Sequence, residues 1–182
     1  MNTFFICALP RSRTAWLANF LSYGPAHCFH EPLGSHDLEE LPEVFRATGR
    51  QYVGTSDSVN TLLVDHLLKI FPLAKLVVVR RPWAEVGNSL VHLGFPTSWE
   101  LLRKMDKALD EIESKHKPLV IDYYNFDAQE IWNYILPDVP FNRERTEMLE
   151  TFNITVPKSV SEAKGEQFLA RTKNVEALIG KR

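Results

Sequence analysis

The feature that most constrains the fold is an unbroken apolar run at residues 76–79, which ends in two arginines and a proline. A strand with one solvated face alternates apolar and polar side chains, whereas this run does not alternate. Residues 75–79 therefore predict a strand covered on both faces, as in the parallel sheets of α/β proteins. A helix is predicted directly after it, at residues 83–93.

Apolar and amphipathic segments alternate along the rest of the chain. Further strands are predicted at residues 3–9, 51–55 and 118–123, and a short strand or loop at residues 29–33. Helices are predicted between them, at residues 15–21, 38–48, 60–71, 98–115 and 127–136. This alternation predicts a three-layer α/β fold, in which a mainly parallel, doubly wound sheet has helices on both faces. The polar C-terminal part is predicted to be helical, with a loop near residues 153–158 in a tail of residues 153–182.

Length and charge set limits on the class of protein. A chain of 182 residues fits one domain, and a hydrophobic share of 45% is enough for a buried core. The net charge is −2, so no overall field attracts nucleic acid or an anionic membrane, and neither is an expected partner. The apolar run at the N-terminus is too short for a signal peptide, and no stretch reaches the roughly 18 apolar residues of a membrane span. We therefore expect a cytoplasmic protein.

The two cysteines, Cys7 and Cys28, form no metal-binding pattern. Zinc sites and disulfide frameworks need more cysteines or closer spacing. Cys7 lies inside the first predicted strand, where it is expected to be a small buried hydrophobic residue.

Two of the predicted strands end in basic residues. The first is followed by the segment PRSRT (residues 10–14), and the buried strand by Arg80 and Arg81. Ligands of open α/β sheets bind at the carboxyl ends of the strands. The start of a helix presents unpaired backbone N–H groups and a positive dipole end, and guanidinium and hydroxyl groups add further partners for an anion. The sequence therefore predicts a phosphate site at residues 10–14.

This loop differs from the phosphate loop of enzymes that hydrolyse ATP or GTP. It contains no glycine and no G-x-x-x-x-G-K-[ST] pattern. The buried strand ends in arginines, where those enzymes have the aspartate that holds Mg²⁺. Such a site suits a donor whose leaving phosphate is neutralised by side chains. Transfer of a sulfuryl group fits, since this group carries less negative charge than a phosphoryl group.

The segment PRSRTAWL (residues 10–17) resembles the 5′-phosphosulfate loop of sulfotransferases that use 3′-phosphoadenosine 5′-phosphosulfate (PAPS). That loop reads P-[KR]-[ST]-G-[ST]-[ST]-[WL]-L, and the chain departs from it at Arg13, in place of glycine, and at Ala15, in place of a hydroxyl residue. The resemblance implies a P-loop fold, PAPS as donor, adenosine 3′,5′-bisphosphate (PAP) as product, and no metal. It assigns donor binding to six consecutive residues: Arg11, Ser12, Arg13, Thr14, Ala15 and Trp16.

A second motif of this family binds the 3′-phosphate of the donor with an arginine at a strand end and a serine eight residues later. Arg81 and Ser89 have this spacing. Residues 119–126 are similar to the strand that precedes the late helix of the family. This similarity bears on the fold more than on the chemistry of the site. The resemblance extends over roughly residues 3–141.

The resemblance also implies catalytic residues. Arg11 is expected to neutralise the bridging oxygen as PAP leaves. Glu31 falls about twenty residues after the start of the loop, where the family often places the base that takes the proton of the acceptor hydroxyl. His30 is the alternative base. Trp16 either stacks near the adenine or packs as a core aromatic residue.

Other functions stay open. The segment from Cys7 to Thr14 satisfies C-x₅-R-[ST], the loop of low-molecular-weight cysteine phosphatases, in which the thiolate of Cys7 attacks phosphorus. A second alternative is a non-catalytic module that keeps the fold and binds a nucleotide without turnover. The departures from the pattern at Arg13 and Ala15 favour it. A nucleotide kinase is disfavoured by the missing lysine and metal acid. The sequence identifies neither the acceptor nor the oligomeric state.

Overall fold

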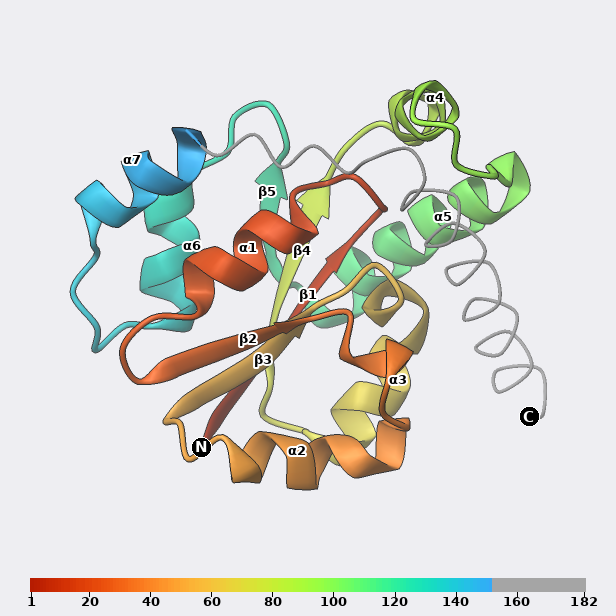
Figure 1. Cartoon of the computed structure of the whole chain (residues 1–182). Helices are drawn as coiled ribbons and strands as arrows, with labels where there is room; N and C mark the ends of the chain where they lie inside the picture. The colour runs from red at the N-terminus through yellow and green to blue at the C-terminus, as the bar shows by residue number, and fades with distance from the viewer. Residues whose placement is uncertain (152–182) are drawn as a thin grey trace.

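A computed structural model describes residues 1–151, so the predicted loop at 153–158 and tail at 153–182 lie outside the described residues. Its centre is a sheet of five parallel strands in the order β2-β3-β1-β4-β5 (Figure 1). The strands are β1 (Asn2–Ala8), β2 (Ala26–His30), β3 (Tyr52–Ser56), β4 (Lys75–Arg80) and β5 (Leu119–Asp122). The predicted α/β class and parallel sheet are confirmed.

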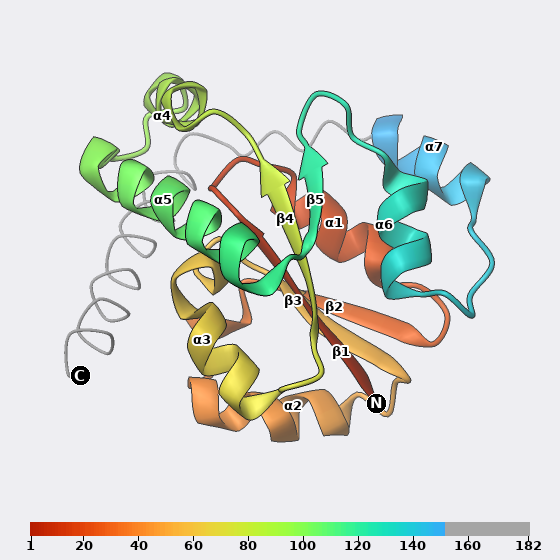
Figure 2. The same ribbon diagram turned by 180° about the vertical axis from the view of Figure 1, so that it is seen from behind.

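Helices cover both faces of the sheet, as the sequence predicts. Figure 1 shows α1 and α6 on one face, and Figure 2, from behind, shows α3 and α5 across the other. Two short 3-10 helices, Pro32–Gly34 and Leu38–Glu40, lie between β2 and α2. The α-helices are α1 (Thr14–Leu21), α2 (Leu41–Ala47), α3 (Asn60–Ile70), α4 (Trp83–His92), α5 (Trp99–His116), α6 (Ala128–Ile135) and α7 (Arg143–Thr151).

The central strand β1 lies where the strand order reverses. β2 and β3 lie on one side of it, and β4 and β5 on the other. Ile6 of β1 is opposite Ser56 of β3 and Val77 of β4. The carboxyl end of a strand at such a reversal is where open α/β sheets bind ligands. The loop after β1 is therefore positioned as the predicted phosphate site requires.

Both faces of the central strands are buried. Phe5 and Cys7 of β1 belong to the core that includes α3 and α5, whereas Phe4 and Ile6 belong to the core that includes α1 and α6. In β4 the residues 76–79 are at most 5% exposed, which confirms a strand covered on both faces. Burying one large apolar side chain contributes roughly 1.5–3 kcal/mol. The two cores thus hold the strands that carry the site.

Two elements differ from the prediction, one because of strand pairing and proline, the other because of proline alone. The second strand starts earlier than residues 29–33, since it pairs with β3 from Ala26 onward, and Pro32 has no N–H with which to extend the ladder. The helix predicted at residues 38–48 is divided into a 3-10 turn and α2. Pro42 lies in the first turn of α2, and its missing N–H cannot bond to the carbonyl of Leu38.

The longest described helix, α5, is amphipathic. The hydroxyl of Ser98 caps its start by accepting a hydrogen bond from the N–H of Leu101. Its outer face is charged. The side chains on its inner face are buried, and these are Leu101, Leu102, Met105, Leu109 and Ile112. Within residues 1–151, no helix is both long and apolar enough to cross a membrane.

Candidate functional site

The loop between β1 and α1 has an unusual backbone for its sequence. Arg11 and Arg13 both adopt left-handed conformations, with φ of 63° and 64°. Residues other than glycine rarely do so, and each such residue costs about 1–2 kcal/mol. The loop thus makes the turn that glycine makes in the sulfotransferase pattern, at the expense of strain. Strained backbone of this kind is concentrated at functional sites.

The start of α1 is open to an anion. Its N-cap residue is Arg13, and no side chain within the described residues caps it. The first backbone bond of the helix runs from the N–H of Leu17 to the carbonyl of Arg13. The earlier N–H groups of the first turn have no partner of this kind, which is the arrangement that binds phosphate at helix N-termini.

Three buried polar groups around the loop lack a partner within residues 1–151. They are Ser12 Oγ, Trp16 Nε1 and Arg81 Nε, and Ser12 is fully buried. A buried group without a hydrogen bond costs about 1–3 kcal/mol. The oxygen atoms of a bound phosphate or sulfate offer acceptors to such groups, so these residues fit an oxyanion.

Arg81 joins the two basic strand ends. Its Nη1 donates a 2.6 Å hydrogen bond to the carbonyl oxygen of Arg11, and its guanidinium carbon lies 4.3 Å from the ring centre of Tyr123. The sequence predicted that both strand ends contribute to one site, and the structure brings Arg11 and Arg81 together.

The other arginine of this pair, Arg80, has a structural role. It forms ion pairs with Asp106, Asp110 and Glu113 on α5. Burial lowers the pKa of Arg80, but Glu113 and Asp110 outweigh burial, and the pKa is raised overall. Arg80 therefore fastens β4 to α5, and Arg81 alone faces the loop.

Aromatic rings after β5 complete this side of the site. The guanidinium of Arg13 lies 4.7 Å from the ring centre of Phe126 and 5.4 Å from that of Tyr123. The ring of Trp16 stacks on Phe20 at 4.7 Å and meets Phe126 edge-on. Trp16 is thus a core aromatic residue that also borders the loop. The sequence analysis gave residues 119–126 a mainly structural role. The signal for their place at the site was that Tyr123 and Phe126 lie at and just after the end of a predicted strand.

Ser89 lies on α4, downstream of Arg81. It is half-buried, and within residues 1–151 no hydrogen bond joins its side chain to that of Arg81. The two residues of the second motif thus lie on one strand–helix unit, and no hydrogen bond joins their side chains within residues 1–151.

The two candidate bases lie at the end of β2. His30 Nε2 is 3.3 Å from Thr14 Oγ1 in the loop, and it is 3.8 Å from Glu31 Oε1. Glu31 adopts a left-handed conformation with φ of 53°. Their side chains are 32% and 38% exposed, so both are accessible to an acceptor. His30 thus contacts the loop through Thr14.

Cys7 lies away from solvent. It is fully buried in the core, and burial, with a smaller effect of the Asp57 charge, raises the pKa of its thiol far above the usual range. A cysteine phosphatase needs a thiolate at neutral pH. The environment of Cys7 opposes that chemistry and agrees with the predicted buried hydrophobic residue.

Asp57 was not among the residues that the sequence singled out. This fully buried carboxylate follows β3 directly, and β3 is the neighbour of β1. The available signal was an acidic residue just after a predicted strand.

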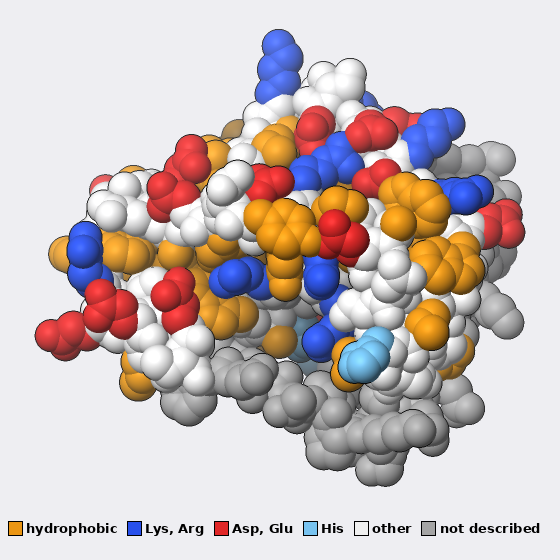
Figure 3. All heavy atoms as spheres, turned by 90° about the horizontal axis from the view of Figure 1, so that it is seen from above, with side chains coloured by type: hydrophobic (Ala, Val, Ile, Leu, Met, Phe, Trp, Pro, Cys, Tyr) orange, Lys and Arg blue, Asp and Glu red, His pale blue; other side chains and the backbone are white. Residues whose placement is uncertain are grey.

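Figure 3, which looks onto the carboxyl edge of the sheet, shows Lys and Arg side chains gathered near the middle of this face with a His side chain beside them. Within residues 1–151, no group of three or more His, Cys, Asp or Glu is placed to hold a metal ion.

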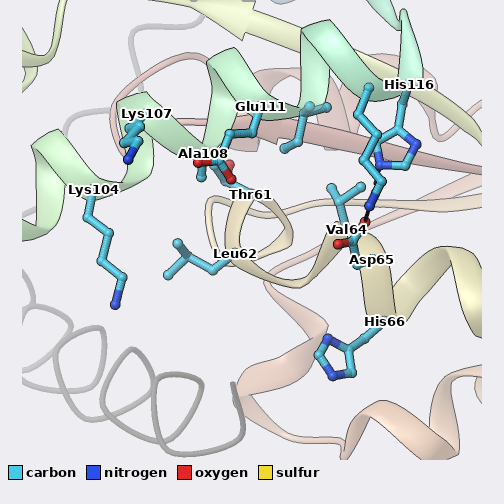
Figure 4. A pocket seen from close by; sticks show the side chains of 12 residues that line it. Thr61, Leu62, Val64, Asp65, His66, Lys104, Lys107, Ala108, Glu111 and His116 are labelled. Atoms are coloured by element: carbon cyan, nitrogen blue, oxygen red, sulfur yellow. Dashed lines mark hydrogen bonds and ion pairs between the residues drawn. The ribbon is translucent and has the colours of Figure 1, made fainter. Parts of the chain in front are cut away.

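A separate groove of about 430 Å³ lies between α3 and α5 (Figure 4). At one end of it Asp65 accepts hydrogen bonds from Lys115 (2.6 Å) and His116 (3.2 Å). The hydrogen bond from Lys115 is the largest influence on Asp65 and lowers its pKa. None of the residues predicted to bind the donor or to be catalytic lines this groove.

Comparison with family models and with curated proteins finds no match. Among solved structures, the chain is similar to the mouse sulfotransferase SULT7A1 in complex with PAP, with a TM-score of 0.57 and 14% identity. The match covers 81% of this chain and 63% of the mouse protein, so the chain spans less than two thirds of its length. A gluconokinase from Sinorhizobium meliloti 1021 matches with a TM-score of 0.48 and 14% identity, over 75% of this chain and 90% of the gluconokinase. The likeness to the mouse protein shows that the chain has a P-loop fold.

Proposed function

We propose that the chain is a sulfotransferase that transfers a sulfuryl group from PAPS to a hydroxyl or amine of an acceptor. The observation that carries this proposal is the hydrogen bond from Arg81 to the carbonyl of Arg11. It links the phosphate loop to the arginine of the second motif, as a donor with phosphates at both its 5′ and 3′ positions requires. The mouse sulfotransferase that shares the fold is in complex with PAP.

Donor binding is assigned to groups that need acceptors. The hydroxyl of Ser12 and the Nε of Arg81 are buried without a partner in the described part of the chain. With the N–H groups at the start of α1, the hydroxyl of Ser12 suits the 5′-phosphosulfate. Arg81 and Ser89 are proposed to hold the 3′-phosphate. Trp16 and Phe126 border the loop and offer ring faces to the adenine.

Arg11 and the end of β2 are proposed to carry the chemistry. PAPS supplies an activated sulfuryl group and needs charge neutralised on its leaving phosphate. Arg11 is exposed in the loop and provides a guanidinium for that charge. Glu31 or His30 is proposed to take the proton of the acceptor, since His30 contacts Thr14 in the loop and Glu31 lies beside it.

A non-catalytic nucleotide-binding module is the second candidate. Ala15 favours it, because a loop with an alanine here offers the donor one hydroxyl fewer than the sulfotransferase pattern. Such a module binds PAP and PAPS alike and transfers nothing. Release of PAP from PAPS in the presence of acceptors separates the two candidates.

Calorimetric titration with PAP, ATP and AMP tests the donor assignment. Wild-type protein is expected to bind PAP at least tenfold more tightly than ATP or AMP, since one charge-assisted contact is worth about 1.5–3 kcal/mol. Arg81→Ala is expected to lose this preference. Arg103→Ala is the matched control, because Arg103 lies on α5 against the ring of Trp83. Equal binding of all three nucleotides by the wild type overturns the proposal.

A further inference from the structure

The guanidinium of Arg13 has no role in the proposed function. The sulfotransferase pattern has glycine at this position, so it assigns no task to a side chain. Arg13 is the N-cap residue of α1, where the positive end of the helix dipole disfavours a cation. Within residues 1–151 its guanidinium forms no ion pair, and it lies against the rings of Phe126 (4.7 Å) and Tyr123 (5.4 Å). The charge is therefore unfavourable unless an anion binds beside it.

The ring of Tyr123 also carries the guanidinium of Arg81. The guanidinium carbon of Arg81 lies 4.3 Å from the ring centre, and that of Arg13 lies 5.4 Å from it. Within the described part of the chain no carboxylate pairs with either arginine, whereas the neighbouring Arg80 binds three. Two like charges this close repel each other, and an anion that binds both offsets the repulsion. Arg13 and Arg81 thus form a basic pair around one ring.

Buried N–H groups without a partner lie against the same rings. Arg81 Nε has no hydrogen-bond acceptor within residues 1–151. Trp16 Nε1 has none either, and the ring of Trp16 meets that of Phe126 edge-on at 5.3 Å. The guanidinium of Arg13 adds five N–H donors. This side of the loop therefore has the hydrogen-bond donors and the charge that bind a phosphate.

The basic pair lies on the side of β1 away from the candidate bases. β4 and β5, which lead to Arg81 and Tyr123, are on one side of β1. β2, which ends at His30, is on the other. A base must reach the acceptor that attacks sulfur, so the sulfuryl end of the donor faces the β2 side. The nucleoside with its 3′-phosphate then extends toward the basic pair.

We propose that Arg13 is a further donor-binding residue, which holds the 3′-phosphate together with Arg81 and so selects PAP over AMP; this inference rests on the proposed sulfotransferase function. Each guanidinium donates N–H bonds to different oxygens of that phosphate. Ser89, the serine of the second motif, forms no hydrogen bond with Arg81 within residues 1–151. Arg13 supplies a second charged ligand, and charge-assisted bonds are roughly twice as strong as neutral ones.

Two variants of Arg13 separate the side chain from the backbone. Arg13→Ala and Arg13→Gly both remove the guanidinium, but glycine adopts the left-handed conformation freely. A defect common to both is therefore due to the lost guanidinium. Arg103→Ala is the matched control, since the guanidinium of Arg103 also lies against a ring, that of Trp83. Calorimetry measures the affinities for PAP and AMP, and melting curves confirm that each variant folds.

Both Arg13 variants are expected to bind PAP about tenfold more weakly, as the loss of one charge-assisted contact implies. Their affinity for AMP, which has no 3′-phosphate, is expected to stay that of the wild type. Arg103→Ala is expected to match the wild type with both nucleotides. In Arg13→Ala/Arg81→Ala the loss of PAP affinity is expected to be smaller than the product of the two single losses, because both arginines bind one phosphate.

Three outcomes overturn this role of Arg13. Unchanged PAP affinity in both folded variants means that the guanidinium binds no part of the donor. An equal loss for PAP and AMP places the guanidinium at the 5′-phosphate. Single losses that multiply in full in the double variant place the two arginines on separate groups. In all three cases a wild type that prefers PAP over AMP leaves the proposed function intact, whereas a wild type without this preference refutes the donor assignment and the role of Arg13 with it.

Discussion

Arg81 at the end of β4 donates a hydrogen bond to the backbone carbonyl of Arg11, across 70 residues of sequence. The same guanidinium lies over the ring of Tyr123, which follows β5. One side chain therefore connects the ends of three strands, β1, β4 and β5. These strands are adjacent in the sheet, in the order β1-β4-β5, so Arg81 ties the loop after β1 to the strands on that side.

Arg81→Lys keeps the charge and tests the geometry of this contact. A lysine lacks the planar fork and stacks poorly on a ring, so PAP affinity is expected to fall about tenfold. Tyr123→Phe keeps the ring beneath the guanidinium and is expected to bind PAP as the wild type does. Calorimetry with both variants makes the comparison. A lysine variant with full affinity means that charge alone explains the role of Arg81.

Arg13→Gly tests the strain in the loop. Glycine adopts the left-handed conformation at position 13 without a steric penalty. Arg13→Ala removes the same guanidinium but keeps a β-carbon, so it is the matched control. The glycine variant is expected to be more stable than the alanine variant by about 1 kcal/mol, measured by urea unfolding. Equal stability of the two variants contradicts the strained backbone at this position.

Gly54→Ala tests the close approach of β3 to β1. A β-carbon at position 54 meets the carbonyl oxygen of Phe4 at 2.2 Å and the Phe4 ring at 2.5 Å. Relief needs movement of the backbone, so a loss of roughly 2–3 kcal/mol or more in unfolding free energy is expected. Gly24→Ala is the control in a turn with no atom within 4 Å, where only the positive φ is unfavourable. Thermal unfolding ranks the two, and a smaller loss at Gly54 than at Gly24 contradicts the packing described.

Asp65 gives a pH dependence with a defined sign. Its folded pKa is lowered, first of all by the hydrogen bond from Lys115. A lowered folded pKa stabilises the protein above the unfolded pKa of about 3.9, and this contribution disappears as pH falls through the folded value. Since the side chain is 44% exposed, Asp65→Asn is expected to cost less than about 1 kcal/mol at pH 7. Urea unfolding is expected to show a smaller difference near pH 3 than at pH 7, and a difference that grows in acid contradicts the assignment.

Cys7→Ala separates the sulfotransferase proposal from a cysteine phosphatase. The thiol is buried and its pKa is raised, so the thiolate needed for attack on phosphorus is disfavoured. PAP affinity is expected to be unchanged in the variant. Neither the wild type nor Cys7→Ala is expected to hydrolyse p-nitrophenyl phosphate. Hydrolysis by the wild type that disappears in the variant favours the phosphatase.

The features that depend on short segments could be predicted from the sequence. The apolar run of β4 predicted a strand buried on both faces, because periodicity is local. The basic residues after two strands predicted a shared site, because all strands of a parallel sheet end at the same edge. Arg11 and Arg81 meet as that argument requires.

The role of Arg80 could not be predicted, because it depends on packing. Arg80 and Arg81 are equivalent in sequence, and only the three carboxylates of α5 assign Arg80 to the scaffold. The start of β2 was misplaced because its pairing with β3, not its composition, determines where it begins.

The left-handed arginines of the loop also affect how related proteins can be recognised. A pattern that demands glycine between residues 11 and 15 passes over this chain, although its backbone turns as a glycine would allow. The side chain of Arg13 also brings a guanidinium to a position where glycine contributes none. A search by backbone angles at the first strand–helix turn, combined with an arginine at the end of the fourth strand, is better suited to finding such loops than a search by letters.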